Sequence, residues 1–151
     1  MEWTIRDATI EDRVAINGVF RRSSLSNEGD RALLLAHPEV LELTEAGLAT
    51  GRTRVAVIHD RIVGFAQVTA HPDRLELDGL FVDPDQMRRG IARDLVLDAA
   101  AIARADGSDH IEVTGNGHAL GFYERMGFVA VGVEVTPLGV TAARLRRATS
   151  E

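Results

Sequence analysis

One stretch constrains the fold of this chain more than any other: residues 82–92, Val-Asp-Pro-Asp-Gln-Met-Arg-Arg-Gly-Ile-Ala. An alternating strand pattern over residues 75–82 ends just before Pro84, and a helical pattern begins at Ile91. The first N–H groups of a helix have no partner inside it, and the helix dipole adds roughly half a positive charge there. Gly90 lets the backbone come close to a ligand. The stretch therefore predicts an anion site of the kind that typically holds a pyrophosphate.

Composition places the chain among ordinary globular proteins. Its 151 residues are 45% hydrophobic and 26% charged, and we expect a single domain over residues 1–151. No run approaches the roughly 18 apolar residues of a membrane helix. The first residues, Met-Glu-Trp-Thr-Ile-Arg, do not resemble a secretory signal. We therefore expect a cytoplasmic protein without a membrane partner.

Charge and missing residue types narrow the chemistry. The net charge of -6 argues against a nucleic-acid partner, which needs a basic face. Without cysteine, disulfides, thiolate nucleophiles and cysteine metal sites are excluded. All 17 basic residues are arginines, which removes a P-loop lysine, a Schiff-base lysine and a lysine general base. A phosphate must then be held by arginine and by backbone N–H groups.

The periodicity of apolar residues predicts an α/β (α+β) fold. We expect strands and helices in this order: strand 1–7, helix from Thr9, helix 32–48, strands 52–59, 62–68 and 75–82, helix 91–106, strand 110–114, helix 119–126, and strands 128–135 and 140–145. A tight hairpin is expected at Asp60-Arg61. The unit from residue 75 to 114 must be a parallel crossover, and the other strands can pair antiparallel. The result is a mixed, mostly antiparallel sheet of about seven strands with helices on both faces.

A second segment points to a family. Residues 116–128 read Asn-Gly-His-Ala-Leu-Gly-Phe-Tyr-Glu-Arg-Met-Gly-Phe. Together with residues 82–92, and in this order, the segment resembles the GCN5-related N-acetyltransferases (GNAT), which share an acyl-CoA N-acyltransferase fold. The family patterns are V-x-P-x-x-(Q/R)-x-x-G-(I/V)-(G/A), followed by N-x-x-A-x-x-(F/L)-Y-(E/K)-x-x-G-F. The main departure is Met87, where the family more often has glutamine or arginine, and the resemblance covers nearly the whole chain.

The resemblance implies a site for acetyl-CoA. Its pyrophosphate would lie among Met87, Arg88, Arg89, Gly90, Ile91 and Ala92. The pantetheine arm would pair with the backbone of Leu80, Phe81 and Val82 as an added strand. Gly79 marks either a bulge that opens the strands or simply a weak strand position. Asn116 is expected either to contact the CoA arm or to cap the following helix.

Two side chains are expected to move protons. Tyr123, the only tyrosine, occupies the family position near the CoA sulfur, and a phenol of pKa about 10 can protonate the departing thiolate. A strand carboxylate would deprotonate the amine, directly or through water. Glu76 matches the position of the base in some family members, and Asp78 is the alternative. His110 and His118 are weaker candidates.

The function expected from this resemblance is transfer of acetyl from acetyl-CoA to a primary amine. Direct attack in a ternary complex is favoured, because without cysteine there is no obvious carrier for an acetyl-enzyme. The alternatives are an acyl-CoA sensor of the same fold and an unrelated nucleotide binder that takes ATP or NAD. No metal is expected, since the five histidines lack an i, i+4 pair, and no G-x-S-x-G elbow is present.

The acceptor is less defined. Residues 23–48 are expected to cover its cleft, where Glu28, Asp30 and Glu39 would favour a cationic amine on a small molecule or a peptide. A homodimer is a further expectation, because the closing strands of this family often support dimers.

Overall fold

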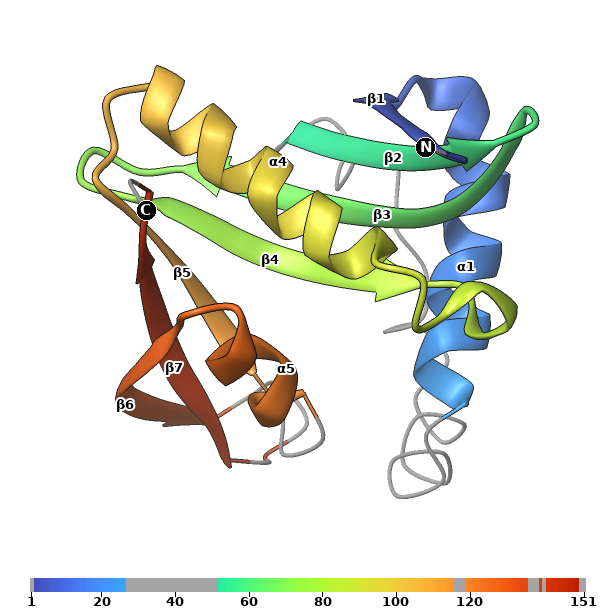
Figure 1. Cartoon of the computed structure of the whole chain (residues 1–151). Helices are drawn as coiled ribbons and strands as arrows, with labels where there is room; N and C mark the ends of the chain where they lie inside the picture. Colours follow the sequence, from blue (N-terminus) through green and yellow to red (C-terminus); the bar gives the residue numbers. More distant parts are fainter. Residues whose placement is uncertain (1, 27–51, 116–118, 136–138, 140, 150–151) are drawn as a thin grey trace. The chain divides into compact units, whose positions relative to one another are not determined.

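The computed structural model describes residues 2–26, 52–115, 119–135, 139 and 141–149 (Figure 1). Its strands are β1 (Thr4–Asp7), β2 (Arg52–Ile58), β3 (Arg61–Ala70), β4 (Leu75–Val82), β5 (His110–Gly115), β6 (Val129–Val135) and β7 (Thr141–Ala148). The described helices are α1 (Arg13–Leu25), α4 (Ile91–Ala105) and α5 (Leu120–Arg125), with 3-10 turns at Ile10–Asp12 and Pro84–Gln86. The helix expected over residues 32–48 and most of the expected acceptor segment lie outside the described residues.

The strands form one mixed sheet of seven in the order β1-β2-β3-β4-β5-β7-β6. β4 and β5 run parallel, whereas β1 with β2, β5 with β7, and β6 with β7 run antiparallel. A parallel pair needs a long crossover connection, and α4 lies in it. The expected α/β class, with a mixed and mostly antiparallel sheet, is confirmed.

The hairpin between β2 and β3 turns one residue earlier than expected. We predicted the turn at Asp60-Arg61, but the residues with left-handed backbone are His59 (φ 46°) and Asp60 (φ 64°), and β3 already begins at Arg61. Positive φ at both central residues is typical of a type I′ turn, whose twist matches that of the flanking strands. Histidine and aspartate are among the residues enriched in this conformation, and arginine is not, which explains the shift.

By internal contacts the chain divides into two compact units. The first comprises Met1–Gln67 and Gly79–Val96, and the second comprises Val68–Asp78 and Leu97–Glu151. The expectation of a single domain stays a prediction.

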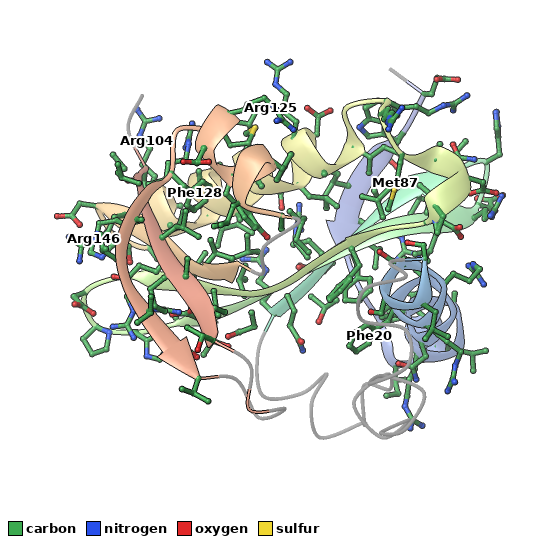
Figure 2. All side chains as sticks on the ribbon, turned by 90° about the horizontal axis from the view of Figure 1, so that it is seen from below. Phe20, Met87, Arg104, Arg125, Phe128 and Arg146 are labelled. Atoms are coloured by element: carbon green, nitrogen blue, oxygen red, sulfur yellow. The ribbon has the colours of Figure 1, made fainter. Side chains whose placement is uncertain are left out.

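In the first unit, α1 buries its apolar stripe on one face of the sheet. The core consists of buried side chains from α1, β2 and β3: Ile16, Val19, Val55, Ile62 and Phe65. Phe20 extends it, because its ring centroid lies 4.6 Å from that of Phe81 and 6.1 Å from that of Phe65 (Figure 2). Burying each such side chain contributes roughly 1.5–3 kcal/mol, so this cluster anchors β4 to α1.

The first turn of α4 packs on the other face of the same unit. Gly64 and Phe65 are neighbours in β3, so their side-chain directions point to opposite faces. A Cβ atom at Gly64 would lie 3.3 Å from a methyl carbon of Ile91 and 3.1 Å from the carbonyl oxygen of Phe81. Helices therefore cover both faces of the sheet in this unit, as expected, and Gly64 permits the start of α4 to lie close to it.

We expect Gly64→Ala to destabilise the protein by about 1–3 kcal/mol, because the added methyl group overpacks a contact with backbone. The matched control is Gly132→Ala in β6, where no atom lies within 4 Å of an added Cβ. Urea unfolding of both variants measures the difference. Equal stabilities of the two variants would contradict the close packing at Gly64.

In the second unit, β4, β5 and β7 bury one face of the sheet. Its buried strand residues include Leu75, Leu77, Ile111, Val113 and Leu145. The helix α5 ends in a Schellman motif: Gly127 has φ 90°, and the N–H of Phe128 donates to the carbonyl of Tyr123 at 3.0 Å. The ring centroids of Tyr123 and Phe128 lie 5.2 Å apart, which is the apolar contact that accompanies this motif. The end of α5 thus fixes the position of Tyr123 within the unit.

Candidate active site

The turn that follows β4 is fixed at its start by Asp83. The N–H of Asp83 donates to the carbonyl of Val63 at 2.8 Å, and its own carbonyl accepts from Gln86 at 2.8 Å. Pro84 occupies the first turn of the 3-10 segment, where its missing N–H is not needed. The backbone is therefore tied to β3 before it enters residues 87–92, which we call the anion turn.

The Asp83 carboxylate joins this turn to α1 and β3. Its side chain is 3% exposed and accepts hydrogen bonds from Arg22, at 3.0 Å from Nε and 2.7 Å from Nη2. Arg61 adds a longer contact at 3.3 Å. Burial acts to raise the pKa of Asp83, but the hydrogen bond and charge of Arg22, helped by Arg61, outweigh it and leave the pKa lowered. Asp83 is thus held as an anion at neutral pH.

Asp83→Asn is expected to destabilise the protein by about 1–2 kcal/mol at pH 7, because two half-exposed guanidinium groups lose their shared counter-charge. A group whose pKa is lowered on folding contributes stability above its unfolded pKa of about 4 and loses it as the pH falls through the folded pKa. Urea unfolding at pH 7 and pH 3 should show the gap between wild type and variant shrinking at pH 3. A gap that is independent of pH would contradict the role of the charge.

The backbone N–H groups of the turn before α4 are available as hydrogen-bond donors. Arg88 has φ 67° and Gly90 has φ 98°, so the chain passes twice through the left-handed region before α4 begins at Ile91. At Arg88 this conformation costs roughly 1–2 kcal/mol, a strain of the kind that collects at functional sites. The first hydrogen bond into the helix runs from the N–H of Asp94 to the carbonyl of Gly90 at 3.0 Å. Within the described residues, no hydrogen bond of good geometry uses the N–H groups of residues 88–92.

The side chains of the turn lie at the surface. Met87, Arg88 and Arg89 are exposed, and Met87 is labelled in Figure 2. Arg89 approaches Glu2 at 3.5 Å, in an exposed pair that contributes little stability. Cations at a helix N-terminus are unfavourable for the isolated helix, so two arginines beside free N–H groups suit a bound anion.

Trp3 secures the first turn of α4, which the sequence pattern did not reveal. Its indole N–H donates to the Asp94 carboxylate at 2.9 Å, and its ring lies 3.9 Å from the position of a Cβ on Gly90. The two hydrogen-bonded residues are 91 positions apart, so no local signal could have linked them.

The pairing of β4 with β5 stops before β4 ends. Its register matches Leu75 with Ile111, Glu76 with Glu112, and Leu77 with Val113, yet the strand continues to Val82. The three residues expected to bind pantetheine, Leu80, Phe81 and Val82, lie in this later part. At Gly79 an added Cβ would lie 3.0 Å from the Phe81 ring, so the glycine makes room for that ring.

Tyr123 is 6% exposed and enclosed by apolar groups. The ring of Phe122 lies 5.3 Å away, centroid to centroid, and a Cβ at Gly115 would lie 3.3 Å from the tyrosine ring. Burial raises the pKa of Tyr123 to about 12. Its hydroxyl makes no hydrogen bond to another described residue, so it is a protonated donor without a fixed acceptor in this part of the chain.

Glu76 belongs to a dense ion-pair cluster around Arg144 of β7. The guanidinium donates to both oxygens of Glu76, at 2.6 and 2.9 Å, and to the Glu112 carboxylate at 2.6 Å. It also donates to the Thr114 hydroxyl at 2.8 Å. Contact with these carboxylates raises the pKa of Arg144, the hydrogen bond to Glu76 being the largest cause. His110 lies at the rim, 3.1 Å from Glu112.

Asp78 differs from Glu76 although both lie on the same strand. Its carboxylate accepts a hydrogen bond from the Thr69 hydroxyl at 2.5 Å, and it is exposed. Partial burial of the group raises the pKa of Asp78, against the opposing effect of the Thr69 hydrogen bond.

The expected site residues fall in different parts of the structure. The first unit holds the turn 87–92 with Leu80, Phe81 and Val82, whereas the second holds Glu76, Asp78 and Tyr123. Asn116 and His118 lie outside the described residues, so their roles stay predictions.

No helix in the described part of the chain combines the length and apolar character needed to cross a bilayer. Those same residues contain no group of three acidic or histidine side chains arranged to hold a metal ion.

Curated proteins give three matches of moderate identity. The chain is 40% identical over 92 residues to a streptothricin acetyltransferase of Streptomyces lavendulae, covering 57% of this chain and 49% of that protein. It is 37% identical over 103 residues to the peptidyl-lysine N-acetyltransferase YjaB of Salmonella typhimurium, covering 67% of each. It is 32% identical over 100 residues to the uncharacterized N-acetyltransferase YvbK of Bacillus subtilis, covering 64% of each. The match thus spans between half and two thirds of these relatives.

Solved structures share the fold at low identity. A GCN5-related N-acetyltransferase from Rhodopseudomonas palustris superposes with a TM-score of 0.80 at 20% identity, covering 98% of this chain and 96% of that one. The PaiA N-acetyltransferase from Thermoplasma acidophilum, in complex with coenzyme A, gives 0.73 at 19% identity, with 98% and 99% covered. The family model described as an acetyltransferase (GNAT) domain matches residues 36–147. Because that match takes in most of the sequence, including the anion turn and Tyr123, the chain belongs to the GNAT family.

Proposed function

We propose that this chain transfers the acetyl group of acetyl-CoA to a primary amine. The observation that carries the proposal is the turn before α4, where the N–H groups of residues 88–92 are free beside Arg88 and Arg89. Coenzyme A presents a diphosphate, the ligand that suits such a helix start. A similar fold has been solved with coenzyme A, and the curated relatives are acetyltransferases, which supports acetyl-CoA as the cosubstrate.

The later part of β4 is proposed to bind the pantetheine arm. Among the described residues, β4 has no pair with β5 past Leu77, so the backbone groups on this edge of the strand can pair with an extended ligand. Leu80, Phe81 and Val82 would pair with the amides of pantetheine as an added strand, in which backbone hydrogen bonds supply the affinity.

The chemistry is direct transfer in a ternary complex. The neutral amine nitrogen attacks the thioester carbon, a C–N bond forms, and the C–S bond breaks. A carboxylate of β4, Glu76 or Asp78, takes the amine proton directly or through water, and the Tyr123 hydroxyl protonates the departing thiolate. Solvent then restores both groups. Direct transfer is favoured because the chain has no cysteine and so no obvious carrier for an acetyl-enzyme intermediate.

The acceptor is proposed to be an amine on a small molecule or a peptide. The named relatives act on both kinds, streptothricin and peptidyl-lysine. They therefore support an amine as the acceptor but do not identify one particular acceptor.

Calorimetry and a turnover assay test the proposal together. The protein is titrated with CoA, ATP and NAD, and release of CoA from acetyl-CoA is followed with streptothricin, spermidine and a lysine peptide. We expect CoA to bind and at least one amine to accelerate its release. CoA binding without release by any amine would indicate a sensor instead, and ATP binding without CoA binding would indicate a nucleotide binder.

A further inference from the structure

We infer that Asp78, rather than Glu76, accepts the amine proton, that Thr69 positions it, and that Glu76 serves the ion-pair cluster of Arg144. The inference rests on the proposed function and names the base that function requires. It depends on the different partners of two carboxylates that lie two residues apart on β4.

Glu76 is poorly suited to take a proton. Both of its oxygens accept hydrogen bonds from Arg144, and its side chain is only 13% exposed. Arg74 approaches the same carboxylate at 3.6 Å. A bidentate guanidinium occupies a lone pair on each oxygen, so an amine proton would have to displace a charge-assisted hydrogen bond to reach this carboxylate.

Glu112 completes this cluster. It accepts from Arg144 at 2.6 Å and from Arg146 at 3.3 Å. Burial would raise its pKa, but the hydrogen bonds from Arg144 and His110 outweigh that effect and the pKa of Glu112 is lowered. The hydrogen bonds of Arg144 thus join Glu76 and Glu112 in one cluster, which is a structural role.

Asp78 has the opposite character. One oxygen accepts from the Thr69 hydroxyl, and the other makes no hydrogen bond to a described residue. The residue is exposed, so its free oxygen is within reach of solvent, and partial burial of the carboxyl group raises its pKa. A carboxylate with a free lone pair and a raised pKa is a better proton acceptor than one that is clamped by arginine.

The position of Asp78 on β4 fits this role. The last pair between β4 and β5 joins Leu77 to Val113. Asp78 is the next residue, so it begins the part of β4 along which the pantetheine arm is proposed to run.

The charged groups around Asp78 predict how its pKa responds to substitution. The charge of Glu76 raises the pKa, whereas the Thr69 hydrogen bond and the charges of His71 and Arg144 lower it. Glu76→Gln should therefore move the acidic limb of the kcat/KM profile to lower pH. Thr69→Val should move this limb to higher pH, and Thr69→Ser should restore it.

The test compares these variants with Asp78→Asn, using acetyl-CoA and the amine that gives the fastest CoA release by the wild type. The matched control is Asp73→Asn, a 70% exposed aspartate in the turn before β4. We expect Asp78→Asn to lower kcat/KM about a hundredfold and to remove the acidic limb, whereas Glu76→Gln keeps this limb and Asp73→Asn stays within tenfold of the wild type. Acetyl-CoA affinity and circular dichroism should be unchanged in all of them.

Two outcomes would overturn the inference: a hundredfold loss in Glu76→Gln with near-normal turnover in Asp78→Asn, or an acidic limb that ignores Thr69→Val. If Glu76→Gln fails to fold, the pH profiles of kcat/KM for Thr69→Val and Thr69→Ser still test the inference. Absence of turnover by the wild type with every amine would contradict the proposed function itself and, with it, the role of Asp78.

Discussion

A protein carrying Arg88→Glu and Arg89→Glu is expected to bind coenzyme A at least about a hundredfold more weakly than the wild type. Each charge-assisted hydrogen bond to a phosphate is worth roughly 1.5–3 kcal/mol, and the substitution adds repulsion to the lost attraction. Both side chains are exposed at the start of α4, so their replacement leaves the core intact. Isothermal titration with CoA at low salt measures the loss.

The matched control is Arg104→Glu with Arg125→Glu, which changes the net charge by the same amount. Both side chains are exposed and lie on other parts of the chain (Figure 2). The control should keep CoA affinity within about threefold, since neither side chain belongs to the turn that is proposed to bind the diphosphate. Retained binding in the Arg88 and Arg89 variant would contradict the anion site.

Tyr123→Phe is expected to lower kcat about tenfold to a hundredfold while leaving CoA affinity unchanged. The phenylalanine ring preserves the contacts with Phe122 and Phe128, and only the hydroxyl is lost. An interaction that is used in the transition state alone affects kcat and not binding. Steady-state CoA release and CoA titration, run side by side, separate the two quantities.

The pH dependence of kcat provides a second test of the role of Tyr123. Because burial raises the pKa of Tyr123 to about 12, the hydroxyl remains protonated well above neutral pH. Loss of this proton donor should therefore cause no alkaline fall in kcat below about pH 10. Unchanged turnover in Tyr123→Phe would contradict the role of Tyr123 as the proton donor. An alkaline limb below pH 10 that disappears in the variant would contradict the raised pKa of its hydroxyl.

Local patterns in the sequence were sufficient for the elements that carry the anion turn. β4 runs over Leu75–Val82 as its alternation predicted, because Pro84 ends the strand pattern within two residues. α4 begins at Ile91 and ends at Ala105, where Gly107 with φ 84° reverses the chain. Such signals are short-range, so the strand, the turn and the helix could each be read from neighbouring residues.

The contacts that tune the site could not be read in this way. Arg144 and Glu76 are 68 positions apart, and nothing near either residue indicates the other. Glu76 matched the family position for a base, yet only the folded sheet shows that an arginine occupies both of its oxygens. The expected homodimer and cytoplasmic location, like the role of Asn116, stay predictions.

We propose that the backbone N–H groups of residues 88–92 bind the diphosphate of coenzyme A. A crystal structure of the protein with coenzyme A tests it most directly. The account predicts diphosphate oxygens about 3 Å from several of these nitrogens, with the Arg88 and Arg89 guanidinium groups alongside. A diphosphate lodged elsewhere, with these N–H groups bonded to other parts of the protein, would contradict it.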